Sequence, residues 1–543
     1  MPKGVFKLPE ITNEPVKSYA PGSPEKKELK ATIAQIKSTV VDLPMIIGGK
    51  EVRTGKLEEI RPPHERAHLL GNYHQGDGTH VRMAIDAALK AKPAWEAMSW
   101  ESRAAIFLKA ADLLAGPYRQ RMNAITMLGQ SKNAFQAEID CVCELADFFR
   151  FNVKNMYEIY HMQPNSAPGI WNRMVWRPME GFIFALTPFN FTSIAGNLPC
   201  APALMGNVCV WKPSKTAVYS AHLIMELLRE AGLPDGVINL VYCSGPAAAE
   251  VIFSDPNFAG LHFTGSTGVF NEIWANVVRN IDKYRTYPRL VGETGGKDYV
   301  FADPTACPKE VATALVRGAF EYQGQKCSAA SRAYIPSNIW PEVEKYMKED
   351  LAKIRMGTVE DFRNFVNAVI DAPSFRKLAA AIDQAKTAKD AEIVAGGTYD
   401  DSKGYFITPT VIRTSNPKYA TMQEELFGPV LTVYVYEPGD VDKTLDLLDE
   451  GSAYALTGAI FSKCREAIEK YTCRLTHTAG NFYINDKPTG AVVDQQPFGG
   501  GRASGTNDKA GSTLNLLRWV SPQTIKETFV PAKDYMYPNF MEE

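Results

Sequence analysis

Short apolar runs alternate with helical stretches from residue 181 onward, and this alternation constrains the fold more than any other feature. The runs cover Gly181–Leu186, Val208–Trp211, Ile238–Tyr242 and Leu261–Thr264. Helical stretches at 216–231 and 247–253 lie between them. Apolar strands joined by helices indicate a parallel, doubly wound sheet, because such strands are buried on both faces. A second alternating region at 297–490 predicts a second α/β unit.

The segments that precede this region have other patterns. Helical periodicity at 79–115 predicts two helices, and we expect Pro93 to separate them because proline interrupts the helical hydrogen bonds. Residues 134–160 are expected to form one long helix. Residues 1–28 are rich in Pro and Lys, which predicts an extended arm.

Charge and cysteine content argue against several classes of protein. The formal net charge is −2, so no global field favours nucleic acid or an anionic membrane. The nine cysteines are scattered without a Cys-x-x-Cys pair, which argues against a disulfide framework or structural zinc and favours a reducing compartment. Neither a membrane span nor a signal or transit peptide is recognised. The sequence therefore predicts a cytoplasmic protein that binds neither nucleic acid nor membrane.

Three polar residues supply the groups that covalent oxidation of an aldehyde needs. Cys327 offers a sulfur nucleophile, Glu293 a general base, and Asn190 an amide donor for a developing oxyanion. A thiolate adds to the carbonyl, a hydride leaves to a nicotinamide, and the resulting thioester is hydrolysed. Each residue alone also has an ordinary interpretation, as a buried cysteine, a capping carboxylate or a turn asparagine. The hypothesis rests on the three together.

A second group of residues suits a dinucleotide. Gly265-Ser266-Thr267-Gly268 follows an apolar strand and opens a helix, whose free N–H groups accommodate a pyrophosphate. The motif is not Gly-x-Gly-x-x-Gly, so an ordinary tight turn explains it equally well. Lys212 ends another strand, at the sheet edge where dinucleotides bind, although a solvated surface lysine is the commoner interpretation of this residue alone. Glu425 offers a carboxylate for a ribose, and Phe427 offers a ring for a nicotinamide, although the motif in isolation also fits a charged helix end before a turn.

A match to the zinc-protease pattern HExxH occurs at His64-Glu65-Arg66-Ala67-His68. That motif needs a stable helix that presents both histidines on one face. Pro62 and Pro63 precede the match and Gly71 follows closely, so a helix there would have two turns at most. Chance matches to so short a pattern are expected, and we predict no metal site.

Seven motifs occur in the order in which aldehyde dehydrogenases carry them. They are TPFNF at 187–191, WKPS at 211–214, GST at 265–267, GETGGK at 292–297, GQKCS at 324–328, EELFGP at 424–429 and PFGG at 497–500. On these motifs the chain resembles the aldehyde dehydrogenase superfamily over about residues 45–530. Within it, stretches at 137–140, 147–152, 187–192, 495–500 and 503–508 are similar to the L-glutamate-γ-semialdehyde, or Δ1-pyrroline-5-carboxylate, dehydrogenase family.

The resemblance implies a division of the chain, which at 543 residues is longer than one core accommodates. An N-terminal arm would cover 1–44. A Rossmann-type NAD-binding domain would comprise 45–165 and 181–296, and an α/β catalytic domain 297–490. The extended segments 166–180 and 515–535 would supply β-strands for oligomerisation, so the implied assembly is a homodimer or a higher homo-oligomer.

By the same resemblance Cys327 is the nucleophile, Glu293 the proton acceptor and Asn190 the oxyanion donor. The residues that would hold NAD are Thr187, Lys212, Gly265, Ser266, Thr267, Gly268, Val269, Glu425 and Phe427. Those that would hold the substrate are Ser328, Gly490 and Ala491 at its α-carboxylate, Phe191 and Phe498 along its aliphatic chain, and Glu144 near its ammonium.

The implied reaction is oxidation of L-glutamate 5-semialdehyde to L-glutamate with NAD, in proline degradation. Two residues depart from the common superfamily pattern. Lys215, three residues after Lys212, replaces an acidic residue that often binds the adenosine 2′-hydroxyl, so use of NADP stays open. Phe270 stands where many members carry glycine.

Three other interpretations stay open on sequence alone. A dehydrogenase for a different semialdehyde, such as succinate semialdehyde, would share the nucleophile but would not bind an α-amino acid head. A zinc hydrolase would use His64 and His68, and metal analysis would identify it. A catalytically silent structural protein would have no reason to retain Cys327, Glu293 and Asn190 together.

Overall fold

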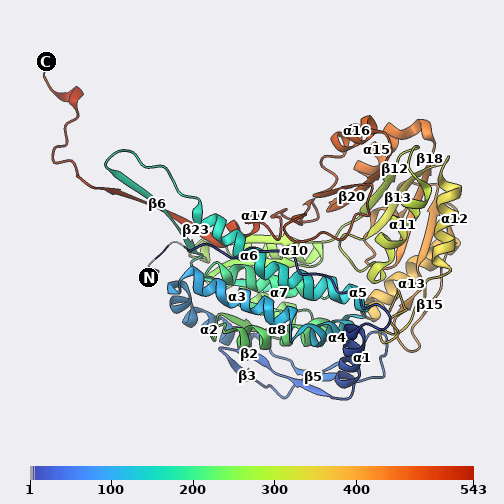
Figure 1. The fold of residues 1–543 in the computed structure, drawn as a ribbon, viewed down its shortest axis with the longest axis horizontal. Coiled ribbons are helices and arrows are strands. Elements are labelled where there is room, and N and C mark those ends of the chain that lie inside the picture. The colour runs from blue at the N-terminus through green and yellow to red at the C-terminus, as the bar shows by residue number, and fades with distance from the viewer. Residues whose placement is uncertain (1–3, 5, 543) are drawn as a thin grey trace.

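The chain forms two α/β units, each built on a seven-stranded sheet, and a two-stranded ribbon that projects from them (Figure 1). We analysed a computed structural model, which describes residues 4 and 6–542. The mixed α/β architecture with largely parallel sheets confirms the predicted fold class. The division into domains with the limits given above stays a prediction.

The first sheet is parallel except at the edge formed by β2 and β3. Its order is β11 (Arg289–Glu293), β10 (Phe258–Thr264), β7 (Phe182–Leu186), β8 (Cys209–Lys212), β9 (Ile238–Leu240), β2 (Met45–Ile47) and β3 (Lys50–Val52). The helices that belong to this unit are α2 (Gly78–Ala97), α3 (Trp100–Ala115), α4 (Arg119–Gln130), α6 (Glu144–His161), α7 (Thr192–Leu204), α8 (Val218–Ala231), α9 (Gly245–Ile252) and α10 (Thr267–Arg279). Apolar side chains of these helices and of the strands form one buried core.

The second sheet is parallel except for β14, which runs antiparallel to β17. Its order is β14 (Ala391–Ala395), β17 (Thr410–Thr414), β18 (Val430–Tyr436), β13 (Ala330–Pro336), β12 (Asp298–Ala302), β20 (Thr457–Phe461) and β21 (Asn481–Ile484). The main helices around it are α11 (Pro308–Phe320), α12 (Trp340–Leu351), α13 (Ala372–Thr387), α15 (Val441–Glu450) and α16 (Arg465–Arg474). Separate apolar cores lie on its two faces.

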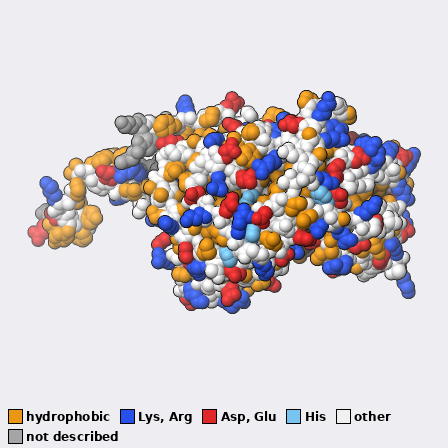
Figure 2. Space-filling model, turned by 90° about the horizontal axis from the view of Figure 1, so that it is seen from below, with side chains coloured by type: hydrophobic (Ala, Val, Ile, Leu, Met, Phe, Trp, Pro, Cys, Tyr) orange, Lys and Arg blue, Asp and Glu red, His pale blue; other side chains and the backbone are white. Residues whose placement is uncertain are grey.

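The projecting ribbon consists of β6 (Ile170–Pro178) and β23 (Val520–Thr528), paired antiparallel along their whole length. Both lie in segments predicted to be extended. The second segment begins differently from the prediction, because α17 (Thr513–Leu516) and a 3-10 turn (Leu517–Trp519) precede β23. Beyond β23 the tail carries exposed apolar side chains, which Figure 2 shows as a cluster at the far left.

Pro93 does not separate two helices, which corrects the prediction. It lies inside α2, on an exposed face where water can bond the carbonyl that loses its N–H partner. The boundary falls later, at Ser99, whose hydroxyl accepts a hydrogen bond from Ser102 N and caps α3. A capping serine therefore marks this junction better than the proline does.

Two other helical predictions also need correction. The N-terminal arm is not extended throughout 1–28, because α1 (Pro24–Lys37) begins after the capping residue Ser23. The helix predicted at 134–160 is divided into α5 (Ala134–Ala137), a π-helical turn (Glu138–Cys143) and α6. A π turn widens the helix locally and is frequent at functional sites.

Phe270 occupies its unusual position because a glycine on β11 makes room for it. The ring of Phe270 stacks on Phe263, with centroids 5.3 Å apart. A Cβ atom on Gly292 would lie 2.1 Å from the Phe270 ring. The two residues therefore fit together only while position 292 lacks a side chain.

Replacement of Gly292 by alanine should lower the free energy of unfolding by about 1–3 kcal/mol, since overpacking forces neighbouring side chains to shift. Denaturant unfolding of the purified Gly292→Ala protein measures this. Gly245→Ala is the matched control, because a Cβ there would meet no atom within 4 Å. Equal midpoints for the two variants would contradict the packing argument.

Candidate active site

The predicted nucleophile and base meet between the two sheets. Glu293 is the last residue of β11 in the first sheet, and Cys327 lies just before β13 in the second. The Cys327 thiol donates to Glu293 Oε1, with Sγ 3.7 Å from that oxygen. Two residues that are 34 positions apart in the sequence are thus in contact.

Burial dominates the electrostatics of this pair. It raises the pKa of the Cys327 thiol well above its usual value, and the neighbouring carboxyls of Glu293, Asp298 and Glu425 raise it further. Burial also raises the pKa of Glu293 to about 7, against the opposing effects of the Cys327 contact and of Lys509. Near neutral pH the thiol therefore keeps its proton while Glu293 is poised to accept one.

The segment that leads to Cys327 has an unusual backbone. Tyr322 and Gln323 adopt positive φ angles of 49° and 53°. The Gln323 side chain is fully hydrogen-bonded: its Nε2 donates to Ser131 O and Ala368 O, and its Oε1 accepts from Asn367 N. These bonds hold a strained turn in place, as is common where a reactive group must be fixed. No sequence pattern pointed to this turn.

Asn190 approaches the same segment from the first unit. Its side chain is buried, and Nδ2 donates to Gln325 O at a distance of 3.1 Å. A primary amide has two N–H donors, so one remains for another acceptor. Gly296 allows the nucleophile loop to come equally close, because a Cβ there would lie 2.3 Å from Cys327 O.

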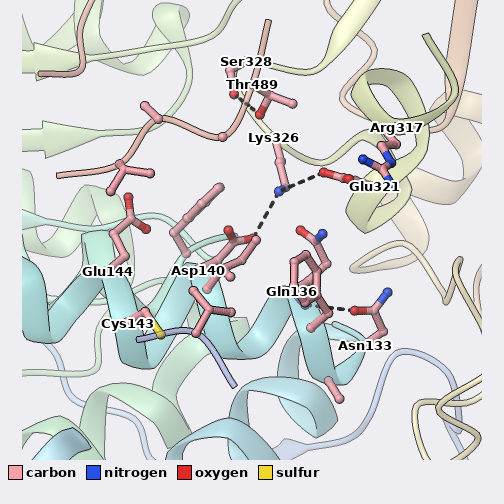
Figure 3. Close-up of a pocket in the computed structure, with 18 of the residues that line it drawn as sticks. Asn133, Gln136, Asp140, Cys143, Glu144, Arg317, Glu321, Lys326, Ser328 and Thr489 are labelled. Carbon is pink, nitrogen blue, oxygen red and sulfur yellow. Dashed lines mark hydrogen bonds and ion pairs between the residues drawn. The ribbon is translucent and has the colours of Figure 1, made fainter. Parts of the chain in front are cut away.

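A cavity of about 840 Å³ opens beside the nucleophile. Among its lining residues are Cys327 and all six predicted substrate residues, Ser328, Gly490, Ala491, Phe191, Phe498 and Glu144. The Ser328 and Thr489 hydroxyls are 2.7 Å apart on its wall (Figure 3). Glu293 faces a smaller adjoining cavity, which Glu144 and Phe498 also line.

A buried charge cluster in the large cavity was missed by the sequence reasoning. Asp140 pairs with Lys132 at 2.7 Å and with Lys326 at 3.4 Å, and Lys326 also approaches Glu321 (Figure 3). The two ammonium groups lie over the ring of Phe191, which fixes one wall of the cavity. Lys326 adjoins Cys327 in the sequence, which is a signal that could have drawn attention to it.

Several predicted cofactor residues gather at the carboxyl edge of the first sheet. Lys212 pairs in register with Leu186, the last residue of β7, so Thr187 follows directly beside it. Thr187 accepts a hydrogen bond from Trp211 Nε1 at 3.0 Å. Lys212 is partly buried, and burial lowers its pKa. Dinucleotides bind at this edge of a parallel sheet.

The predicted pyrophosphate turn opens α10. Ser266 is the N-cap and its hydroxyl accepts from Val269 N, while the first N–H groups of any helix lack partners within it. A Cβ on Gly268 would meet no atom within 4 Å, so this turn is open to a ligand. The combination of free N–H donors and open space fits a phosphate group.

Glu425 and Phe427 come to the site from the second unit. Glu425 Oε1 accepts from Gly296 N at 3.0 Å, and a Cβ on Gly295 would collide with the same carboxylate. Phe427 has a φ of 58° and packs edge-on against Phe189 with ring centroids 5.9 Å apart. The two glycines after Glu293 therefore serve a close approach between the two units.

The histidines of the HExxH match do not lie on a helix, because residues 61–68 form turns and loop. His64 Nδ1 is 2.7 Å from Ser131 Oγ, and burial lowers the His64 pKa to about 4. Within residues 4 and 6–542, no group of three or more His, Cys, Asp or Glu side chains is arranged to hold a metal ion. This geometry gives no support to a zinc hydrolase. In the same part of the chain, no helix is long and apolar enough to cross a membrane.

Comparisons with known proteins agree with the site. The model of the aldehyde dehydrogenase family matches residues 51–525. The mitochondrial Δ1-pyrroline-5-carboxylate dehydrogenase of Dictyostelium discoideum is 50% identical, with 98% of this chain and 96% of that protein covered. Its mitochondrial counterpart from Bos taurus is 46% identical, with coverage of 97% and 94%.

A solved structure with a similar fold also carries the name Δ-pyrroline-5-carboxylate dehydrogenase. The crystal structure of the Δ-pyrroline-5-carboxylate dehydrogenase from Mycobacterium tuberculosis bound with NAD superposes with a TM-score of 0.96 at 50% identity, covering 99% of this chain and 100% of that one. The seven motifs, the Cys327–Glu293 contact and these matches lead to one conclusion: the chain belongs to the aldehyde dehydrogenase family.

Proposed function

We propose that the protein oxidises L-glutamate 5-semialdehyde to L-glutamate with NAD, the reaction that supplies glutamate in proline degradation. The observation that carries the proposal is the single cavity that Cys327 shares with Ser328, Thr489 and Gly490. These residues can bind a carboxylate beside the nucleophile, as an amino acid semialdehyde requires. Relatives at 45–50% identity that are named for this activity support the proposal.

The loop around Gly490 suits a carboxylate. Gly490 has a φ of +98°, a conformation that glycine adopts easily and that turns backbone N–H groups toward an anion. Lys487 Nζ donates to Thr489 O at 2.9 Å and brings a positive charge behind the loop. The Ser328 hydroxyl adds a donor from the nucleophile side.

Glu144 suits the ammonium group of the same substrate. Burial, together with the nearby Asp140, raises the pKa of Glu144 to about 8, although Ser193 donates to it at 2.5 Å. With a pKa of about 8, the Glu144 carboxyl is mostly protonated at neutral pH. A bound ammonium favours the charged carboxylate, so the Glu144 proton would leave when the substrate binds.

The proposed chemistry assigns one task to each buried residue. Cys327 Sγ loses its proton to solvent and adds to the aldehyde carbon, while an Asn190 N–H donates to the oxygen that becomes negative. NAD, when bound, accepts the hydride. A water molecule, whose proton goes to Glu293, then attacks the thioester, and the carbon–sulfur bond breaks to release the acid product and the Cys327 thiolate. Because a charged Glu293 raises the thiol pKa, its main task in this scheme comes after the thioester has formed.

The choice between NAD and NADP depends on the residues near the adenosine ribose. Lys215 is exposed. It lies three residues after Lys212, the last residue of β8, and is the first residue of a 3-10 turn. We propose NAD as the preferred cofactor, because a solved relative at 50% identity is bound with NAD. NADP is proposed as a weaker alternative, because a lysine at position 215 does not repel a 2′-phosphate.

Assembly and compartment are also part of the proposal. The β6–β23 ribbon and the tail after it expose apolar side chains (Figure 2). In the tail, Val530 is 81% and Tyr535 87% exposed. Exposed apolar surface of this kind favours association, and we propose a homodimer or higher homo-oligomer through the ribbon. A cytoplasmic location stays a prediction, since relatives of this chain are named as mitochondrial.

Steady-state kinetics test the proposed function directly. The purified enzyme is assayed with glutamate semialdehyde, succinate semialdehyde and propanal, each with NAD and with NADP. We expect the highest kcat/KM for glutamate semialdehyde with NAD. A preference for succinate semialdehyde would contradict the assignment, because that substrate lacks the ammonium group proposed to face Glu144.

Removal of the Ser328 hydroxyl should reduce kcat/KM for glutamate semialdehyde by about 10–100-fold, because a hydrogen bond to a charged group is worth roughly 1.5–3 kcal/mol. Propanal has no carboxylate and should lose little. Ser331→Ala is a matched control, since its buried hydroxyl has no hydrogen-bond partner in the described part of the chain. Equal losses for both aldehydes in Ser328→Ala would mean that Ser328 supports the nucleophile instead.

Lys215→Glu should increase the preference for NAD over NADP by about tenfold, equivalent to ~1.4 kcal/mol of repulsion between the new carboxylate and a 2′-phosphate. Lys215→Gln separates this repulsion from the loss of the lysine itself. The measurement is the ratio of kcat/KM for the two cofactors, and an unchanged ratio in Lys215→Glu would show that residue 215 does not face the ribose.

The rate of thioester hydrolysis should rise with pH and level off, with a midpoint near the Glu293 pKa of about 7. The sign follows because Glu293 must be unprotonated to accept a proton from water. Single-turnover rates of thioester hydrolysis between about pH 6 and about pH 8 would show this rise. Glu293→Gln should remove the rise with pH. A hydrolysis rate that does not change with pH in the unaltered enzyme would argue against Glu293 as the base.

A further inference from the structure

The substrate cavity is partly walled by a segment outside the core of the family. Asn13, Glu14, Val16, Ser18 and Tyr19 line the cavity that contains Cys327. The match to the aldehyde dehydrogenase family begins only at residue 51. This segment runs extended along α6 before α1 begins (Figure 1), and it passes below Cys143 in the close-up of the cavity (Figure 3). We call residues 11–19 the strap.

Asn13 connects α6 to the loop that follows Gly490. Its Nδ2 donates to Asp147 Oδ2 on α6 at 2.8 Å and to Val493 O on the loop at 3.0 Å. Its Oδ1 accepts from Gln495 Nε2 at 3.0 Å. One side chain thus uses both its donor and its acceptor groups to join two walls of the cavity.

Apolar contacts reinforce the same junction. Phe148 and Phe151 of α6 form a small buried cluster with Val493 of the loop, and Ile11 of the strap packs against it. This cluster is separate from the three larger cores of the molecule. The loop therefore packs on α6 through a contact that the strap completes.

Ion pairs and a hydrogen bond hold the strap at Glu14, the residue that follows Asn13. The Glu14 carboxylate binds Arg119 Nη1 and Arg150 Nη1, each at 2.7 Å, and its backbone N–H donates to Asp147 Oδ1 at 2.6 Å. Arg119 is itself buried. Loss of Glu14 would leave the buried Arg119 charge without this partner, which is energetically costly. The pairing therefore stabilises the position of the strap.

The strap continues onto the π-helical turn. Lys17 N donates to Glu138 Oε1 at 2.9 Å, and the Tyr19 hydroxyl donates to Glu138 Oε2 at 2.8 Å. The strap is thus anchored along the helices of the first unit, and Asn13 hydrogen-bonds from it to the loop that follows Gly490.

We propose that the strap sets the position of the loop at residues 490–495, and that Asn13 is a positioning residue for binding of the substrate carboxylate. Asn13 acts through Val493 and Gln495, three and five residues after Gly490. A loop released from α6 would hold its N–H groups less accurately for the carboxylate, while Cys327 and Glu293 would be unaffected. The inference rests on the proposed function insofar as the loop binds a carboxylate.

Asn13→Ala is the test, with Thr12→Ala as the matched control because Thr12 is the exposed neighbour of Asn13 on the same strap. KM and kcat are measured for glutamate semialdehyde and for propanal. Asn13→Ala should raise KM for the semialdehyde by about tenfold, as expected for the loss of two hydrogen bonds that fix the loop. Its kcat and both constants for propanal should change less than twofold, and Thr12→Ala should resemble the unaltered enzyme.

Hydrogen exchange of the backbone provides a readout that needs no substrate. Peptides that cover residues 488–496 should exchange faster in Asn13→Ala than in Thr12→Ala, whereas peptides that contain Cys327 should be unchanged. If the unaltered enzyme oxidised propanal but not the semialdehyde, the proposed function would fail, and loop exchange would still report on the strap.

Two results would overturn the inference. One is loop exchange that stays unchanged in Asn13→Ala. The other is a parallel loss of activity toward both aldehydes, which indicates general damage. If Asn13→Ala does not fold, Gln495→Ala removes the loop-side contact from an exposed position, and it should raise both loop exchange and KM for the semialdehyde by a smaller factor. Absence of both effects in Gln495→Ala would equally refute the proposal that the strap positions the loop.

Discussion

A thiol and a carboxyl are buried in contact at the junction of two sheets, and the rest of the site depends on that contact. Burial opposes charge on both groups, so Cys327 stays protonated at rest and Glu293 has a pKa of about 7. The protonated thiol is a weak nucleophile, so the pair is unreactive in the absence of substrate. In the proposed reaction, donors such as the amide of Asn190 would stabilise the negative charge that develops when the thiolate attacks the aldehyde.

The fold produces this contact by bringing the ends of parallel strands to one place. Glu293, Lys212 and Thr187 follow from the register of β11, β10, β7 and β8 in the first sheet. The second sheet presents Cys327 on a strained turn, and glycines at 295 and 296 allow the two units to approach each other. The cavity at their junction is lined by Cys327, the predicted nucleophile, and by the polar residues proposed to bind the carboxylate and ammonium groups of an amino acid.

Much of the site could be predicted because its residues lie in short contiguous motifs with a known chemical logic. Cys327, Ser328 and Phe191 were expected to lie close together, and all three line one cavity. The Asp140–Lys132–Lys326 cluster and the strap were not predicted, because they depend on tertiary contacts between distant segments. Pro93 was misjudged because a proline on an exposed helical face costs one hydrogen bond and does not require the helix to end.

Rapid mixing of a Glu293→Gln enzyme with glutamate semialdehyde and NAD tests the central claim, which is that Cys327 forms the thioester and Glu293 serves its hydrolysis. The amide removes the base but also removes a charge that opposes the thiolate. The account predicts a rapid burst of NADH, about one per active site, followed by a turnover that is slower by about 100-fold or more. A variant without a burst, in which both phases slow together, would contradict it.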